Sequence, residues 1–321
     1  MNFEIDEQQR DFAASIDAAL GSADVPAAVR AWSAGDTGPG RKVWATLSHL
    51  GVTALAVAEE FDGIEAHPVD LVVAVERLGY WGVPGPVAES IAVAPVLLAS
   101  QKEGAERSAG LASGELIATV AMRPHTPRAV DADTAGLILV AGDGQVRDGT
   151  AGDKQESVDP ARRLFDVTAV GEAQNADTAK AFEFGALATA AQLIGAGQAM
   201  LDASVEYAKQ RSQFGRVIGS YQAIKHKLAD VYIAVELARP LVYGAALSLA
   251  DGSPDTARDV SAAKAAASEA ALLSARSSLQ THGAIGFTQE HDLSLLLLRV
   301  QALRSAWGDP TWHRRRVLEA L

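Results

Sequence analysis

Apolar residues recur along the chain with two different spacings, and the changes between them divide the sequence into three parts. Up to residue 114, short stretches place apolar side chains three and four residues apart, as at Val43, Leu47 and Leu50, which is the spacing of one helix face. Residues 3–12 form an acidic, amphipathic stretch of the same kind. We therefore expect an N-terminal domain of short helices over residues 1–114, each packing its apolar face on the others.

Residues 115–176 have the pattern of short strands. Branched apolar runs separated by glycine and aspartate favour strands joined by turns. The predicted strands are residues 116–120, 135–141 and 164–170. The Gly-Asp-Gly sequence at 142–144 predicts a tight turn, so we expect a small β domain here.

From residue 177 to 321 the sequence predicts helices again, now long and rich in alanine. Glycine, proline and polar breaks give expected helices near 178–211, 221–250, 255–282 and 289–304. The second of these carries an apolar stripe at Ile224, Leu228, Val231, Val235 and Ala238. Such a stripe is typical of a helix in a four-helix bundle. The expected fold class is mainly α with a small β domain.

Composition excludes several classes of function. The chain of 321 residues has no cysteine, so disulfides and thiolate chemistry are excluded. A net charge of −12 disfavours nucleic-acid binding, which needs a basic surface; we expect the arginine run at 314–316 to be a solvated helix face or a partner contact. No apolar run reaches 18 residues, and the acidic start differs from a secretory signal. We expect a cytoplasmic protein without membrane insertion.

Familiar catalytic motifs are missing. The seven histidines are scattered without a pair at metal-ligand spacing, so no metal site is expected. The sequence contains no phosphate loop, no Gly-x-Ser-x-Gly elbow and no dinucleotide fingerprint. The informative stretches are YAKQRSQFGRVIGSYQAIKHKLAD at residues 207–230 and QTHGAIGFT at residues 280–288.

Each of these stretches has a binding interpretation and a structural one. Arg211 falls at an expected helix C-terminus, where a cation is favoured, and the following turn could present its guanidinium to a pyrophosphate. The alternative is an arginine that only caps its helix. Gln280 lies one turn before a glycine-rich helix end where backbone can approach a ligand closely. The alternative is a glycine C-cap with Gln280 on the surface.

Together the two stretches resemble the C-terminal signatures of the acyl-CoA dehydrogenase family, and residues 51–63, 70–79 and 95–98 more weakly resemble its N-terminal domain. The resemblance implies that family's fold, with an N-terminal helical domain (1–114), a reduced β domain (115–176) and a C-terminal four-helix bundle (177–321). It also implies FAD, with part of the flavin site contributed across a subunit boundary. The cofactor-binding residues it implies are Arg211, Gln213, Phe214, Ile218, Tyr221, Gln280, Gly283 and Ala284.

The chain departs from the family in three places. The family's flavin-contacting middle segment corresponds to residues 119–127, which keep only a proline, and the tryptophan of the following strand is missing because residues 82–306 contain no Trp. The half of the site that grips the flavin ring is therefore expected to be missing. Gly283 is followed by alanine where the family usually has a second glycine.

The third departure concerns catalysis. The resemblance implies a carboxylate that removes an α-proton of an acyl-CoA while the flavin accepts a hydride. The family's base position falls on Gly308, and the alternative position falls on Gly185, whose usual arginine neighbour is Ala186 here. Asp309 is a fallback, although a turn is the simpler interpretation. We expect no catalytic residue in this chain.

His282 lies within the second signature. We prefer a packing role for it over a catalytic one.

These features are similar to the short, base-deficient subunits of heteromeric (α2β2) acyl-CoA dehydrogenases in actinobacterial steroid catabolism. The implied function is α,β-desaturation of an acyl-CoA thioester, such as a steroid or lipid side-chain CoA. A longer partner subunit would carry the catalytic glutamate, and electron-transfer flavoprotein or a similar acceptor would take the electrons. The alternatives are a flavin-dependent monooxygenase component of the same fold and a non-catalytic scaffold.

Overall fold

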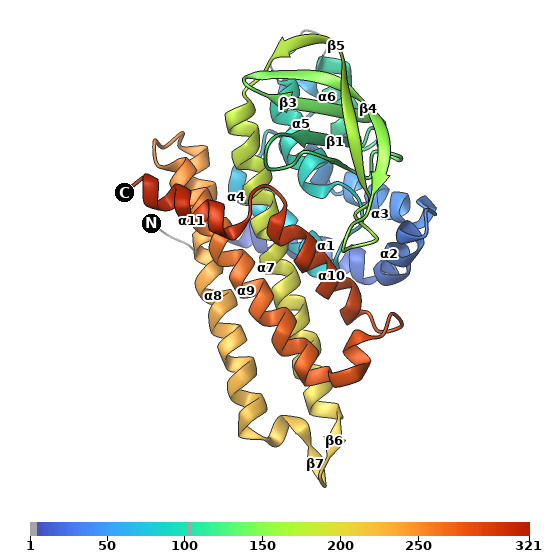
Figure 1. The fold of residues 1–321 in the computed structure, drawn as a ribbon, viewed down its shortest axis with the longest axis vertical. Helices are drawn as coiled ribbons and strands as arrows, with labels where there is room; N and C mark the ends of the chain where they lie inside the picture. The colour runs from blue at the N-terminus through green and yellow to red at the C-terminus, as the bar shows by residue number, and fades with distance from the viewer. Residues whose placement is uncertain (1–4, 100, 102–103) are drawn as a thin grey trace.

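The computed structural model describes residues 5–99, 101 and 104–321. Short helices and a five-stranded sheet form one end of the molecule, and three long helices extend to the other end, where a two-stranded hairpin forms the tip (Figure 1). The chain is mostly helical with one small domain-like sheet, so the predicted fold class is confirmed.

The N-terminal part consists of short helices around a buried apolar core. They are α1 (Glu7–Gly21), α2 (Val25–Ser33), α3 (Gly38–His49), η1 (Val52–Ala54), η2 (Glu59–Phe61), α4 (Pro68–Trp81), the π-helical η3 (Ala88–Val93), α5 (Ala94–Leu98) and α6 (Gly104–Ala112). Helix α1 begins with a capping box, in which the Asp6 side chain accepts from the Gln9 backbone and Gln9 reciprocates. Residues 3 and 4 of the predicted amphipathic stretch lie outside the described residues. The predicted face of α3 is buried at Val43 and Leu47.

The sheet contains the three predicted strands and two further ones. Its strands are β1 (Ala118–Met122), β2 (Ala129–Val130), β3 (Leu137–Gly142), β4 (Gln145–Gln155) and β5 (Leu164–Asn175), in the order β1-β3-β4-β5-β2. Strands β1 and β3 are parallel, and the other pairs are antiparallel. The predicted turn joins β3 to β4, with positive φ at Asp143 and Gly144, as a two-residue hairpin turn of the mirror-image type requires.

Five helices complete the chain. They are α7 (Thr178–Gln210), α8 (Gln222–Ala250), α9 (Thr256–His282), α10 (Leu293–Ser305) and α11 (Pro310–Glu319). The first three match the predicted ranges closely. The fourth starts at Leu293 and not near 289, because the residues before it form a turn. The predicted stripe of α8 is buried from Leu228 to Ala238, with Ile224 partly buried.

Helix α7 is the centre of the molecule and packs against α4, α8 and α9. Glycine permits its close approach to α4, since a Cβ at Gly195 would lie 1.9 Å from the backbone oxygen of Glu76. Helices α7 and α8 are long and apolar enough to cross a membrane, but 94% of the apolar window of α7 is buried inside the protein, against 44% for α8. Helix α7 is thus a core helix, whereas α8 keeps an exposed apolar face.

The arginine run on α11 differs in part from expectation. Arg314 and Arg315 are exposed, as a solvated face would be, and Arg314 also pairs with Glu269 of α9 over 3.2 Å. Arg316 is less exposed, forms an ion pair with Glu183 of α7 and lies over the rings of Phe182 and Trp312. The last arginine therefore fastens α11 to the bundle.

Candidate functional site

The first predicted stretch forms a rigid hairpin at the tip of the bundle. Strands β6 (Ser212–Gln213) and β7 (Arg216–Val217) are joined through Phe214 and Gly215, both with positive φ. Tyr221 donates a hydrogen bond to the Gln213 carbonyl over 3.3 Å, and the guanidinium of Arg216 lies 3.9 Å from the centre of the Tyr221 ring. These contacts fix the hairpin against the start of α8.

Arg211 and Phe214 point away from this hairpin into solvent. Arg211 is the C-cap of α7, and its backbone N–H donates to the Tyr207 carbonyl over 2.9 Å. Its exposed guanidinium has no hydrogen-bond or ion-pair partner among the residues that the structure describes. Phe214 is 92% exposed, whereas Ile218 is partly buried against the core. The hairpin therefore presents a free cation beside an uncovered aromatic ring.

The second stretch lies at the end of α9, beside α8. Lys227 of α8 donates a hydrogen bond to Oε1 of Gln280, so the amide N–H groups of Gln280 remain available to bind another group. Gly283 has a positive φ and no atom within 4 Å of the place where a Cβ would be, so its backbone is open to close approach. Ala284 is exposed, and Phe287 at the end of η5 (Gly283–Phe287) is 75% exposed.

His282 does not face this surface. It is buried, its ring is stacked on Tyr207 with centroids 4.4 Å apart, and its Nδ1 lies 2.9 Å from the Ser278 carbonyl. Burial lowers the pKa of His282. The structure thus places His282 in packing between α9 and α7. Leaving out His282, we call residues 211–221 and 280–287 together the tip surface.

The two predicted base positions, far apart in sequence, meet at a single tryptophan. Gly308 directly follows Trp307, and a Cβ at Gly185 would lie 2.5 Å from the Trp307 ring. Trp307 is fully buried, has a positive φ, and donates from Nε1 to Oε1 of Glu89 over 3.2 Å. Ala186 beside it is also buried. An indole therefore fills the space between positions where the resemblance implies a carboxylate and an arginine.

Asp309 has a structural role in this geometry. It is the N-cap of α11, and its Oδ1 accepts from the backbone N–H groups of Thr311, over 2.7 Å, and Trp312, over 3.1 Å. The hydrogen bond from Trp312 is the main cause that lowers the pKa of Asp309. A carboxylate held in this way stabilises a helix start.

Two buried bases hold the turn that carries Trp307. Lys264 donates from Nζ to the carbonyls of Leu303, Arg304 and Gly308, over 3.1–3.2 Å, and burial lowers its pKa to about 7. His313 lies with Nε2 2.9 Å from the Trp307 carbonyl and Nδ1 3.0 Å from Oγ of Ser261. Burial lowers the pKa of His313 to about 3. Sequence reasoning missed both residues, which no motif marks.

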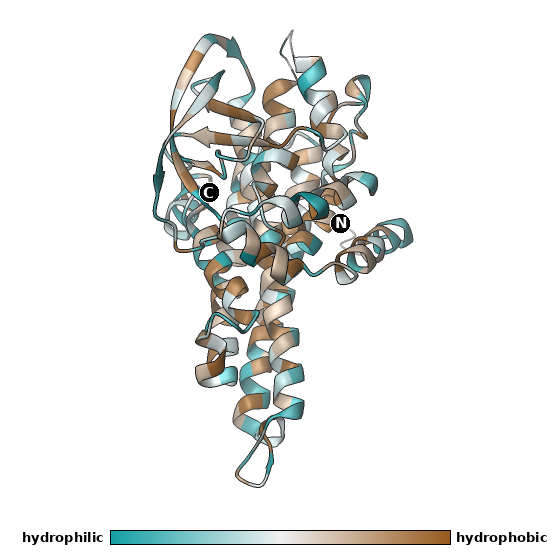
Figure 2. Cartoon of the chain, turned by 90° about the vertical axis from the view of Figure 1, so that its right-hand side faces the viewer, coloured by the Kyte–Doolittle hydropathy of each residue, from teal (hydrophilic) through white to brown (hydrophobic). Residues whose placement is uncertain are grey.

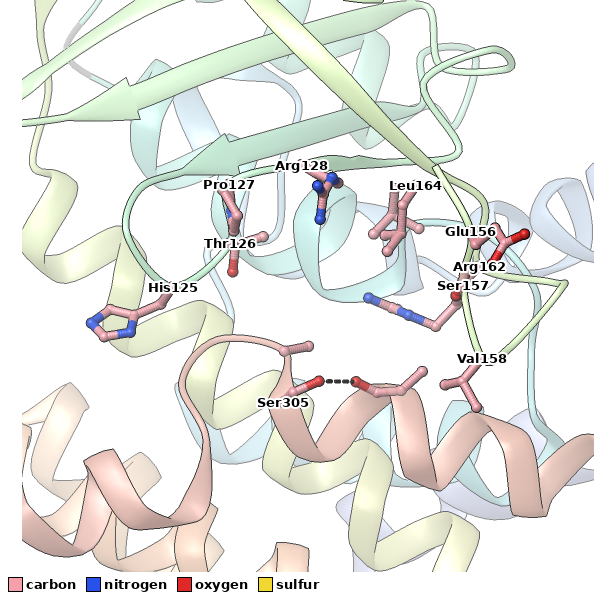
Figure 3. Close-up of a pocket in the computed structure, with 13 residues that line it drawn as sticks. His125, Thr126, Pro127, Arg128, Glu156, Ser157, Val158, Arg162, Leu164 and Ser305 are labelled. Carbon is pink, nitrogen blue, oxygen red and sulfur yellow. Dashed lines mark hydrogen bonds between the residues drawn. The ribbon is translucent and has the colours of Figure 1, made fainter. Parts of the chain in front are cut away.

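A cleft of about 340 Å³ lies between the sheet and α10. Figure 3 shows His125, Thr126 and Arg128 on one side, Arg162 reaching in from another, and Ser305 of α10 opposite. His125–Pro127 belong to the stretch that corresponds to the family's flavin-contacting segment. Among the described residues that line the cleft, His125 carries the one aromatic ring and none is Phe, Tyr or Trp, so they offer no large aromatic face on which a flavin ring could stack. Among the described residues, no three His, Cys, Asp or Glu side chains gather as metal ligands.

Comparison with known proteins gives one consistent family. Residues 6–115 match the model of the acyl-CoA dehydrogenase N-terminal domain, and residues 176–321 match that of the acyl-CoA dehydrogenase C-terminal domain. The acyl-CoA dehydrogenase IpdE2 of Mycobacterium tuberculosis is 34% identical over 295 residues, which are 91% of this chain and 90% of that protein.

Two solved structures have the same fold. A chain of the ChsE4–ChsE5 complex from Mycobacterium tuberculosis aligns with a TM-score of 0.85 and 21% identity, over 99% of this chain and 98% of that one. A variant of the Tcur3481–Tcur3483 steroid acyl-CoA dehydrogenase aligns with a TM-score of 0.84 and 19% identity, over 98% and 97%.

Proposed function

The chain belongs to the acyl-CoA dehydrogenase family, and from this premise we propose that it is the subunit of a heteromeric dehydrogenase that lends its tip surface to a flavin site on a longer partner. The partner carries the catalytic glutamate. The observation that carries the proposal is the contrast between two places in one chain. The base positions are closed by buried Trp307, while the tip keeps an exposed Arg211, without a side-chain partner among the described residues, beside a rigid hairpin.

The tip surface fits the adenine and diphosphate part of FAD. The guanidinium of Arg211 can pair with two phosphate oxygens, and Gln280 can donate from the amide that Lys227 leaves free. The open backbone at Gly283 lets a ligand approach closely. Phe214 offers a ring for apolar contact. Bound FAD would accept the hydride removed from the β-carbon of the substrate.

The apolar face of α8 and α9 supports a subunit contact. Leu237 is 70% exposed, and Tyr232, Ile233, Leu241 and Leu273 are also exposed. Hydrophobic residues recur along the long helices down to the tip (Figure 2). A groove of about 440 Å³ lies between α8 and α9 along this face. Clustered exposed apolar side chains of this kind mark protein–protein contacts, and the proposed contact is an α2β2 assembly.

We propose that the complex desaturates an acyl-CoA thioester of a steroid or a related lipid. Two likenesses support this: a steroid acyl-CoA dehydrogenase shares the fold, and a chain of a two-component complex shares it as well. Reduced flavin would pass its electrons to electron-transfer flavoprotein or a similar acceptor. Since this chain offers no carboxylate at either base position, proton abstraction falls to the partner.

Co-expression with a longer dehydrogenase subunit tests the proposal. The expected product is a yellow complex with one flavin per heterodimer, active only when both chains are present. Turnover by this chain alone would refute the division of roles. A complex that consumes oxygen without desaturating acyl-CoA would indicate a monooxygenase component, and a complex without flavin would indicate a scaffold.

The Arg211→Ala substitution tests the tip surface within that complex. Loss of a charge-assisted hydrogen bond should raise the dissociation constant of FAD about 10- to 100-fold, which corresponds to about 1.5–3 kcal/mol. Lys209→Ala is the matched control, because Lys209 is an exposed cation at the same helix end that pairs with Glu206 over 2.6 Å. Equal flavin retention in both variants would remove Arg211 from the site.

A further inference from the structure

Arg162 stands apart from the other buried arginines of the chain. It is 4% exposed, yet among the described residues its guanidinium donates no hydrogen bond and has one ion-pair partner within 4 Å, Oε1 of Glu89 at 3.7 Å. Its charge also acts on the buried carboxylate of Asp131. By contrast, Arg163 donates to the Trp32 carbonyl and Asp133, and Arg299 donates to Asp159 and the Val83 carbonyl. The nitrogens of Arg162 are not among the fully enclosed side-chain atoms that lack a partner, so they face open space. A planar fork of five donors in that position is suited to an acceptor that the chain itself does not supply.

The cleft between the sheet and α10 is where that acceptor would lie. Arg162 lines it and reaches toward its middle (Figure 3). Thr126, in the loop between β1 and β2, also lines the cleft and is 8% exposed. Its buried Oγ1 has no hydrogen-bond partner among the described residues. The position of Thr126 is fixed, since its backbone N–H and carbonyl both bond to Met122. A guanidinium without a hydrogen bond among the described residues and a hydroxyl without one thus border the same cavity.

The rest of the cavity decides the kind of ligand. Its remaining walls are largely apolar, with Pro127, Val130, Val158, Leu164, Ala302 and Ala306. A volume of about 340 Å³ is near the lower limit of small-molecule sites, which span roughly 300–1,000 Å³. The ligand should therefore have a compact apolar body and one polar end.

The charged groups around the cleft indicate which polar group the ligand should carry. Arg128 at the rim is already paired with Asp166 over 3.0 Å, Glu156 is an exposed carboxylate at the mouth, and Glu89 lies behind Arg162. These negative charges disfavour a dianion such as phosphate. A single planar carboxylate matches the guanidinium fork with two parallel hydrogen bonds, and the Thr126 hydroxyl can donate a third.

We infer that this cleft is a binding site for a small monocarboxylate with an apolar body, held by Arg162 and Thr126. The site lies at the sheet end of the molecule, whereas the tip surface lies at the opposite end (Figure 1). The inference therefore does not rest on the proposed flavin site, and binding should be the same for the free chain and for its complex.

Calorimetric titration of the full chain with benzoate tests the site. We expect saturable binding with one benzoate per chain, and at least tenfold weaker binding of benzyl alcohol, which has the same ring without the charge. Absence of saturable benzoate binding at concentrations up to about 10 mM, the weak end of the affinity scale, would overturn the inference. Equal binding of the alcohol would also overturn it.

Four variants locate the binding. Thr126→Val keeps the shape and all charges and should weaken benzoate binding three- to tenfold, while Arg162→Gln should weaken it at least 30-fold. Since Arg162→Gln leaves Glu89 without its cation, the double variant with Glu89→Gln is measured beside it to separate misfolding from loss of binding. Arg128→Gln at the rim is the control and should change affinity less than threefold. Unchanged binding in the Thr126 and Arg162 variants would place benzoate elsewhere.

Discussion

The buried His313 predicts a specific loss of stability in mild acid. Its Nε2 lies 2.9 Å from the Trp307 carbonyl, which can only accept, so Nε2 carries the proton of the neutral ring and Nδ1 faces the Ser261 hydroxyl. Burial, followed by the nearby charge of Lys264, lowers the pKa of His313 from 6.5 to about 3. A second proton is therefore taken up far more readily by the unfolded chain than by the folded one.

This difference in the pKa of His313 between the folded and unfolded chain fixes the sign and the size of the change in the free energy of unfolding. The stabilisation from a group with a lowered pKa is complete above pH 6.5 and is lost as the pH falls towards the folded-state value. Each unit below 6.5 removes about 1.4 kcal/mol, so at pH 5 the free energy of unfolding should be lower by about 2 kcal/mol on account of His313 alone.

Asp131 has the opposite effect and must be separated from it. Burial raises the pKa of Asp131 from 3.8 to about 6, so its contribution is lost as the pH rises from 3.8 to 6. The measurement is therefore a difference between proteins. In His313→Gln the amide can still donate to the Trp307 carbonyl but takes up no proton, while Asp131 is unchanged.

Denaturant unfolding at pH 7 and pH 5 provides the assay. The stability advantage of the wild-type chain over His313→Gln should shrink by about 2 kcal/mol between the two pH values. His226→Gln, at an exposed position on α8, serves as the control and should show no such change. A wild-type advantage that is constant to within about 0.5 kcal/mol would refute the assignment of a neutral, buried imidazole.

Three further changes test packing, catalysis and assembly. Gly195→Ala places a Cβ 1.9 Å from a backbone oxygen of α4 and should lower the free energy of unfolding in denaturant by about 3 kcal/mol or more. Gly197→Ala is the control: its Cβ would have its nearest atom at 3.5 Å, and it should raise the free energy of unfolding by up to about 1 kcal/mol. Similar effects of the two substitutions would contradict the close approach of α7 to α4. Gly308→Glu should destabilise the fold, because its Cβ would lie 2.6 Å from the His313 ring, and it should give no dehydrogenase turnover. Activity with an acyl-CoA would show that a carboxylate at this position can reach a substrate. Leu237→Glu should leave the chain folded by circular dichroism but separate it from its partner in size-exclusion chromatography, and an intact complex would exclude this face from the interface.

The long helices were predictable because their breaks are local. Asp177 caps α7 by accepting from the backbone of the third helical residue, and the turn at residues 251–254 separates α8 from α9. Strand β4 could not be read from the sequence because most of its side chains are exposed and polar. The start of helix α11 was missed, although the arginine run at 314–316 was expected on a helix face. The Asp309-Pro310 pair is a helix-start signal, with an N-cap followed by proline at the first helical position, but it was interpreted only as a turn.

The candidate site likewise has a part that the sequence predicts and a part that it does not. The tip surface was visible because Arg211 to Tyr221 are contiguous in sequence and their geometry follows from one hairpin. The enclosure of Trp307 could not be predicted, since it joins Glu89, Gly185, Lys264 and His313 from separate elements. Arg162 was invisible for a related reason: what distinguishes it is a partner that it lacks, and this depends on how the sheet meets α10.

Helix α7 runs from the closed space at Trp307 to the tip surface, and its length gives a reason why the two places differ. Gly185 and Arg211 are 26 residues apart on and at the end of one helix, which separates them by about 39 Å at 1.5 Å per residue. A single cofactor molecule cannot reach from the closed space at Trp307 to the tip of the same chain. A cofactor that the tip surface contacts would therefore be held mainly by another subunit, as we propose, and closing the interior with an indole would not affect it. The distance supports the proposal that Arg211 and Phe214 act when a second chain covers them.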